Sequence, residues 1–118
     1  MVENDISQLD FSDSPLGSGG ARCVASAISC CKDLHEIHLS NCEIKDSGAL
    51  ALFEELKKTP GVKLINLDGN QMTENCLDEL FVLLGQNKTI KSVSVKGIKV
   101  NSKLYLQKIK EFGDRIKI

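Results

Sequence analysis

The chain has 118 residues, of which 42% are hydrophobic and 26% are charged, a balance typical of a single globular domain. Aromatic residues make up only 4%, so we expect a core of aliphatic side chains. No apolar run approaches the roughly 20 residues of a membrane-spanning helix, which argues against a membrane span. The acidic N-terminus has no hydrophobic stretch behind it, which argues against a signal peptide.

Five cysteines are present, and no two have the Cys-x-x-Cys spacing of a zinc site or a redox motif. We therefore expect reduced, mostly buried thiols, a cytoplasmic or nuclear protein, and no metal or cofactor.

The clearest feature of the sequence is a repeat of 28 residues. An apolar-x-x-apolar-x-apolar pattern occurs at Ile6, Leu9 and Phe11, at Leu34, Ile37 and Leu39, at Val62, Ile65 and Leu67, and at Ile90, Val93 and Val95. A later apolar position keeps the same spacing at Leu16, Ile44, Met72 and Val100. The pattern predicts strands near residues 6–12, 34–40, 62–68 and 90–96.

A helical period follows each predicted strand, with side chains at i, i+3, i+4 and i+7 on one face. These positions are Ala21, Val24, Ala25 and Ile28; Ala49, Leu52, Phe53 and Leu56; Leu77, Leu80, Phe81 and Leu84; and Tyr105, Lys108, Ile109 and Phe112. We expect Asp46 and Thr73 to cap two of the helices at their start, and Gly85 and Gly113 to end two of them.

One strand–helix unit cannot bury its own apolar stripe, whereas stacked units can. The sequence therefore predicts an α/β solenoid with a concave parallel sheet of four strands and helices on the convex side. A single domain over residues 1–118 would contain repeats at about 6–33, 34–61, 62–89 and 90–118.

The segments 37–44 (IHLSNCEI) and 65–72 (INLDGNQM) resemble the leucine-rich-repeat signature L-x-L-x-x-(N/C)-x-L. The 28-residue length, with Cys42 and Asn70 at the (N/C) position, is similar to the ribonuclease-inhibitor-like subclass. That subclass includes Ran GTPase-activating proteins, tropomodulins and the sensor ends of nucleotide-binding immune receptors. The resemblance implies a repeat fold that binds another protein, and it names no partner.

Two features depart from this signature. Ile98 stands where the Asn belongs, so we expect the last turn to have a different shape. The first strand has no cap before it, since only residues 1–5 precede it. We therefore expect an array cut from a longer protein, or an open edge at Leu9 and Phe11 through which the chain self-associates.

Polar side chains between the apolar strand positions are predicted to face the concave side of the sheet, where repeat proteins commonly bind partners. The candidate binding residues are Asp10, Ser12, Glu36, His38, Ser40, Asn66, Asp68, Ser94 and Lys96. Asp10 and His38 fall on neighbouring strands about 4.8 Å apart and are within reach of each other. No nucleophile or phosphate-binding loop accompanies them, so we expect no enzymatic activity.

Charge is distributed unevenly along the chain: residues 1–87 carry a net charge of −8 and residues 88–118 a net charge of +7. The basic end includes Lys91, Lys99, Lys103, Lys110 and Arg115. Its aromatic residues, Tyr105 and Phe112, fall on the predicted apolar face of the last helix, so we expect no aromatic stacking surface of the kind that binds single-stranded nucleic acid. Binding of a protein on the concave face is the favoured function. The alternatives are GTPase regulation of the Ran GTPase-activating type, or binding of an acidic partner or nucleic acid at the basic end.

Overall fold

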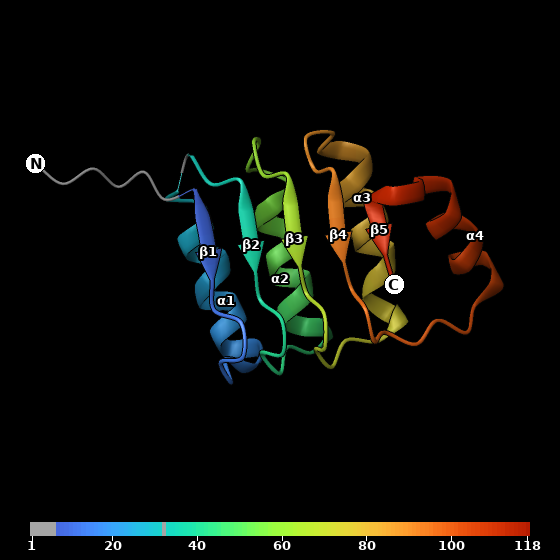
Figure 1. The fold of residues 1–118 in the computed structure, drawn as a ribbon, viewed down its shortest axis with the longest axis horizontal. Helices are drawn as coiled ribbons and strands as arrows, with labels where there is room; N and C mark the ends of the chain where they lie inside the picture. Colours follow the sequence, from blue (N-terminus) through green and yellow to red (C-terminus); the bar gives the residue numbers. More distant parts are fainter. Residues whose placement is uncertain (1–6, 32) are drawn as a thin grey trace, which may run out of the picture.

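The computed structural model describes residues 7–31 and 33–118, so Ile6 and the five residues before it lie outside the described part. A parallel sheet has the strand order β1-β2-β3-β4-β5, with helices packed along one side of it (Figure 1). The strands are β1 (Gln8–Asp10), β2 (Glu36–His38), β3 (Leu64–Asn66), β4 (Ser92–Ser94) and β5 (Ile116–Lys117). The helices are α1 (Gly17–Ile28), α2 (Asp46–Leu56), α3 (Leu77–Gln86) and α4 (Lys103–Phe112), with short 3-10 turns at Glu74–Cys76 and Gly113–Arg115.

The predicted repeat sets the register of the first four strands. Leu9, Ile37, Ile65 and Val93 pair with one another from strand to strand. The strands are shorter than predicted, but the backbone hydrogen bonds continue beyond them, as from the Phe11 amide to the His38 carbonyl at 3.0 Å. The parallel α/β architecture predicted from the repeat is therefore confirmed.

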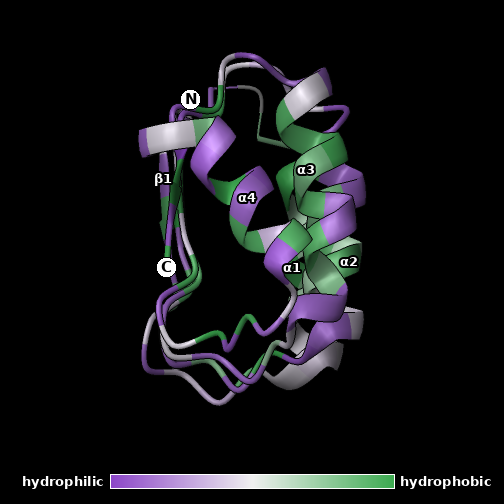
Figure 2. Cartoon of the chain, turned by 90° about the vertical axis from the view of Figure 1, so that its right-hand side faces the viewer, coloured by the Kyte–Doolittle hydropathy of each residue, from purple (hydrophilic) through white to green (hydrophobic). Residues whose placement is uncertain are grey.

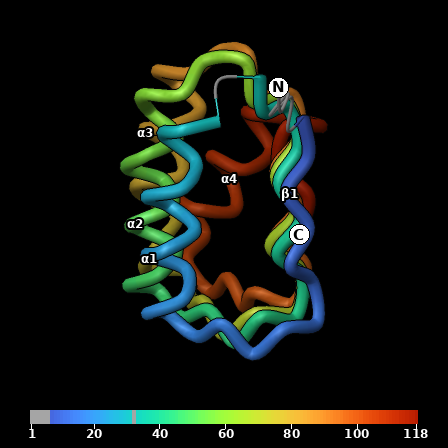
Figure 3. The backbone as a smooth tube through the Cα atoms, turned by 90° about the vertical axis from the view of Figure 1, so that its left-hand side faces the viewer, coloured from blue at the N-terminus to red at the C-terminus, as the bar shows by residue number. Residues whose placement is uncertain are grey.

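The end view in Figure 3 shows the sheet and the helix layer facing each other, and the apolar core lies between them. Ile37 and Ile65 of the sheet are each 1% exposed, and Phe53 of α2 is 0% exposed. Burying one such side chain contributes about 1.5–3 kcal/mol. Helices α1 and α2 approach each other closely at Gly48, where an added Cβ would lie only 3.0 Å from the Cβ of Ala21.

The last repeat differs from the prediction. The sheet has a fifth strand, β5, and α4 leaves the helix layer to lie across the end of the solenoid, between the two layers (Figure 2). Ile109 is the buried residue of α4, and Gly113 follows the helix with a φ of 61°. Lys108 is exposed, whereas Val24, Leu52 and Leu80 at the corresponding positions of the other helices are buried.

Two predicted helix boundaries were wrong. Gly85 lies inside α3, which continues to Gln86. Asp46 is the first residue of α2 rather than its cap. Its carboxylate instead accepts two hydrogen bonds from Thr73 of the next repeat, one from the amide at 2.7 Å and one from the hydroxyl at 2.5 Å. Thr73 does act as a cap: its hydroxyl accepts from the Asn75 amide at 3.2 Å.

Candidate functional site

A row of polar residues crosses the concave face from strand to strand. Asp10 pairs with His38, His38 with Asn66, and Asn66 with Ser94, as predicted. The structure adds Lys117 of β5, which lies beside Ser94. The sequence did not reveal Lys117 as a member of the row, because β5 follows β4 at a spacing other than 28 residues.

A second row follows the ends of the strands, and hydrogen bonds join its members. The Ser40 amide donates to the Ser12 hydroxyl at 3.2 Å. Asp68 accepts from the Ser94 hydroxyl at 2.6 Å and from the Lys96 amide at 2.8 Å. The Asp68 carboxylate therefore stabilises the end of the sheet, whereas the Lys96 side chain is exposed.

Asp10 and His38 lie on paired positions, and each makes a local contact. The His38 ring nitrogen Nε2 lies 3.0 Å from Oε1 of Glu36, two residues earlier on the same strand. Asp10 accepts a hydrogen bond from the Ser12 amide at 3.0 Å. That bond is the main reason why the pKa of Asp10 falls below its ordinary value of 3.8, with a smaller contribution from the charge of His38.

Charge changes sign along the concave face. Asp10 lies on β1 and Glu36 lies on β2. Lys96 follows the end of β4, and Lys117 lies on β5. The sheet thus presents carboxylates at its N-terminal end, small polar groups and the Asp68 carboxylate in the middle, and ammonium groups at its C-terminal end. Such an arrangement selects for a surface of opposite polarity.

The basic end is divided between exposed lysines and a structural arginine. Lys91, Lys99, Lys103 and Lys110 are exposed. Arg115 is half-buried, and its guanidinium donates to three backbone carbonyls: Ile90 at 3.0 Å, Leu84 at 3.0 Å and Asn87 at 3.3 Å. It therefore fastens the C-terminal segment to the end of α3 and the loop that follows it.

The cysteines are less buried than expected. Cys42 and Cys76 are buried, Cys31 is half-buried, and Cys23 and Cys30 are exposed. Burial raises the pKa of the Cys76 thiol to about 12 and also raises the pKa of Cys42 above its ordinary value of 9.0. Both buried thiols are therefore in the protonated, unreactive form at neutral pH.

Residues 7–31 and 33–118 lack the features of two other kinds of site. No group of three or more His, Cys, Asp or Glu side chains in this part of the chain is placed to hold a metal ion. None of the helices described above is long and apolar enough to cross a bilayer.

Comparison with known proteins supports the repeat assignment. Residues 30–53 match a leucine-rich-repeat family model. Comparison with curated protein sequences gives no significant match.

Solved structures agree with the whole fold. The actin-binding site 2 of leiomodin-1 superposes with a TM-score of 0.79 at 15% identity, over 96% of this chain and 82% of that one. The tropomodulin C-terminal domain from Caenorhabditis elegans gives a TM-score of 0.76 at 17% identity, over 96% of this chain and 85% of that one. The 28-residue repeat, the matched segment and these two folds identify the chain as a leucine-rich-repeat solenoid, consistent with the ribonuclease-inhibitor-like subclass.

Proposed function

We propose that this chain is a protein-binding module that holds its partner on the concave face of the sheet. The observation that supports the proposal best is the polarity of that face, where side chains from five adjacent strands run from carboxylate to ammonium. The proposed contact residues are Asp10, Ser12, Glu36, His38, Ser40, Asn66, Asp68, Ser94, Lys96 and Lys117.

A row of five strands spaced about 4.8 Å apart extends over roughly 19 Å, a length suited to a helix or strand of a partner protein. Each exposed charge contributes at most about 1 kcal/mol, so affinity would come from several contacts acting together. The partner would present basic groups opposite β1 and β2 and acidic groups opposite β4 and β5.

Actin is the first partner to test, since the similar leiomodin-1 structure is described as an actin-binding site. Binding would be measured by fluorescence titration with monomeric actin and by sedimentation with filaments. We expect Lys96→Glu and Lys117→Glu to weaken binding about three- to tenfold each, because they place a carboxylate opposite an acidic partner surface. Lys58→Glu reverses an exposed charge near the end of α2 and is the matched control.

The outcomes test the identity of the partner and the position of the binding site separately. Absence of actin binding by the unmodified chain would remove actin as the partner. Binding that Lys96→Glu and Lys117→Glu leave unchanged, or that Lys58→Glu weakens equally, would remove the concave face as the site.

A second candidate function is binding of an acidic surface by the basic end. It is supported by Lys91, Lys99, Lys103 and Lys110, which are exposed and make no ion pair with any residue in the described part of the chain. Retention on heparin that is lost between low and moderate salt would support this function. A chain that passes through heparin unretained at low salt would contradict it.

A further inference from the structure

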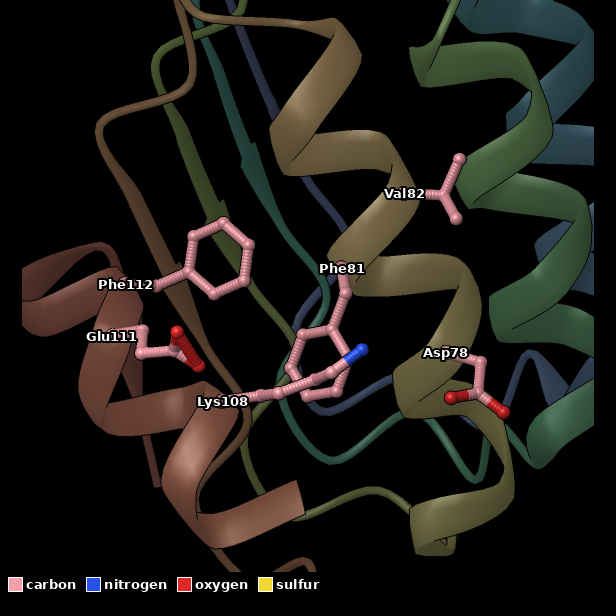
Figure 4. A pocket seen from close by; sticks show the side chains of 6 residues that line it. All are labelled: Asp78, Phe81, Val82, Lys108, Glu111 and Phe112. Carbon is pink, nitrogen blue, oxygen red and sulfur yellow. The ribbon is translucent and has the colours of Figure 1, made fainter. Parts of the chain in front are cut away.

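The departure of α4 from the helix layer opens a groove between α3 and α4, on the opposite side of the molecule from the concave face. The groove has a volume of about 480 Å³ (Figure 4). It is lined by Asp78, Phe81, Val82, Lys108, Glu111 and Phe112. Its size falls within the range of about 300–1,000 Å³ that is typical of binding pockets.

Aromatic rings form a fixed floor in this groove. Phe81 and Phe112 stack with their ring centroids 5.7 Å apart and their planes 10° apart. Tyr105 meets Phe81 edge-on at 5.9 Å, and its hydroxyl donates to Asp78 at 2.9 Å. These contacts hold the rings in place before any ligand arrives, which lowers the entropy cost of binding.

Val82 makes the wall of the groove apolar where the corresponding positions of the other repeats are polar. Residues at a spacing of 28 are Ser26 on α1, Glu54 on α2 and Val82 on α3. All three are exposed, and Val82 is 42% exposed. An exposed apolar side chain beside a hollow is a frequent mark of an interaction site.

The rim of the groove carries more negative than positive charge. Asp78 and Glu111 contribute two carboxylates, and Lys108 contributes one ammonium group, which lies 5.6 Å from the centre of the Phe81 ring. Within the described residues, none of these three side chains forms an ion pair. The groove therefore favours a ligand that brings an apolar group together with positive charge.

We propose that this groove is a second docking site, which binds a segment of a partner protein that carries a large apolar side chain flanked by lysine or arginine. The apolar side chain packs on Phe81, Phe112 and Val82. The flanking cation meets Glu111 or Asp78. This site is separate from the concave face, so one chain is able to hold two partner segments at once.

The test uses synthetic helical peptides of equal length that share a leucine face and differ in their flanks, which are lysine, serine or glutamate. Labelled peptides are titrated with the full chain, and amide chemical shifts locate the bound peptide. We expect the lysine-flanked peptide to bind at least about tenfold more tightly than the glutamate-flanked one, with the serine-flanked peptide between them. The shifts should gather on α3 and α4.

Variants test the assignment to the groove. Val82→Glu introduces the residue type that α2 has at the same position, so we expect it to fold normally and to weaken binding at least about tenfold. Glu111→Gln should weaken binding about two- to fivefold and reduce its salt dependence. Ser26→Glu changes the equivalent position on α1 and should leave binding unchanged, and circular dichroism verifies that each variant folds.

Several results would overturn the proposal. These are equal affinity for lysine and glutamate flanks, shifts located away from α3 and α4, no effect of Val82→Glu, or no binding at the highest soluble peptide concentration. A dimer that sedimentation detects and that Val82→Glu abolishes would instead assign the groove to a second copy of this chain.

Discussion

The side chain of Asn70 holds the backbone of the preceding repeat at Cys42. Its Oδ1 atom accepts from the Cys42 amide at 2.8 Å and from the Ile44 amide at 3.1 Å. Its Nδ2 atom donates to the carbonyls of Leu39 at 2.8 Å and Leu67 at 3.0 Å. With a longer bond from Nδ2 to the Asp68 carbonyl at 3.4 Å, one carboxamide thus contacts five backbone groups in two neighbouring turns, which explains why an Asn at this position joins one repeat to the next.

We expect Asn70→Ala to lower the free energy of unfolding by about 2–3 kcal/mol, since it leaves buried backbone groups without partners. Urea denaturation followed by circular dichroism measures the loss. Ser14→Ala is the matched control at the corresponding position of the first repeat, with an expected change within about 0.5 kcal/mol. Equal losses in the two variants would contradict the role assigned to Asn70.

The buried thiols give a prediction for reactivity. In the native chain at pH 8, an alkylating reagent should label the exposed Cys23 and Cys30 quickly, and label Cys42 and Cys76 only after denaturation. Mass spectrometry of digested samples identifies the labelled residues. Rapid native labelling of Cys76 would show that the helix covering it opens readily.

The same burial predicts a decrease in stability at high pH. The pKa of Cys76 rises from an ordinary value of 9.0 to about 12 in the folded chain, because burial disfavours the thiolate. The unfolded chain therefore loses this proton first, so the stabilisation is complete below about pH 9 and declines as the pH rises from 9 towards 12. Urea denaturation across this range should show a steeper decline for the native sequence than for Cys76→Ala. Parallel declines would contradict the prediction.

The sequence predicted the parts of the fold that repeat, because stacking forces Leu9, Ile37, Ile65 and Val93 into one register. It could not predict β5, which has two residues and lies off the 28-residue spacing. The position of α4 was missed because it depends on contacts outside the repeat pattern, such as the stacking of Phe112 on Phe81. The sequence also did not show that Lys117 lies in the concave row, or that Arg115 donates to backbone carbonyls. Both features depend on how the C-terminal segment folds back onto β4.

Arg115 should be the residue that fastens this end segment. We expect Arg115→Ala to lower the free energy of unfolding by about 2 kcal/mol, because three buried or half-buried carbonyls lose a charged donor. Hydrogen exchange should show the largest loss of protection in α4 and β5. Lys110→Ala removes an exposed charge from α4 and is the control, with an expected change within about 0.5 kcal/mol. A loss of protection spread evenly over all five strands would contradict the local role of Arg115.

The opposite end of the solenoid is built from smaller apolar groups. In α1 the buried residues include Ala21, Val24 and Ala25, where α3 has Leu77, Leu80 and Phe81. Among residues 7–31 and 33–118, strand β1 pairs with β2 alone, and Phe11 beside it is 42% exposed. Leu9, Phe11, Leu16 and Cys23 line an apolar hollow at this end.

Because the stability of a solenoid is close to a sum of repeat and neighbour terms, local opening should begin in the first repeat. We expect amides of residues 7–12 to exchange faster with solvent than those of residues 62–68 when the chain is dilute. If the β1 edge pairs with a second copy, protection of residues 7–12 should rise with protein concentration. Phe11→Lys should abolish that rise, while a lysine at the exposed position Ser26 should not. Equal protection of both segments in a chain that sedimentation shows to be monomeric would mean that the first repeat is not the weak end.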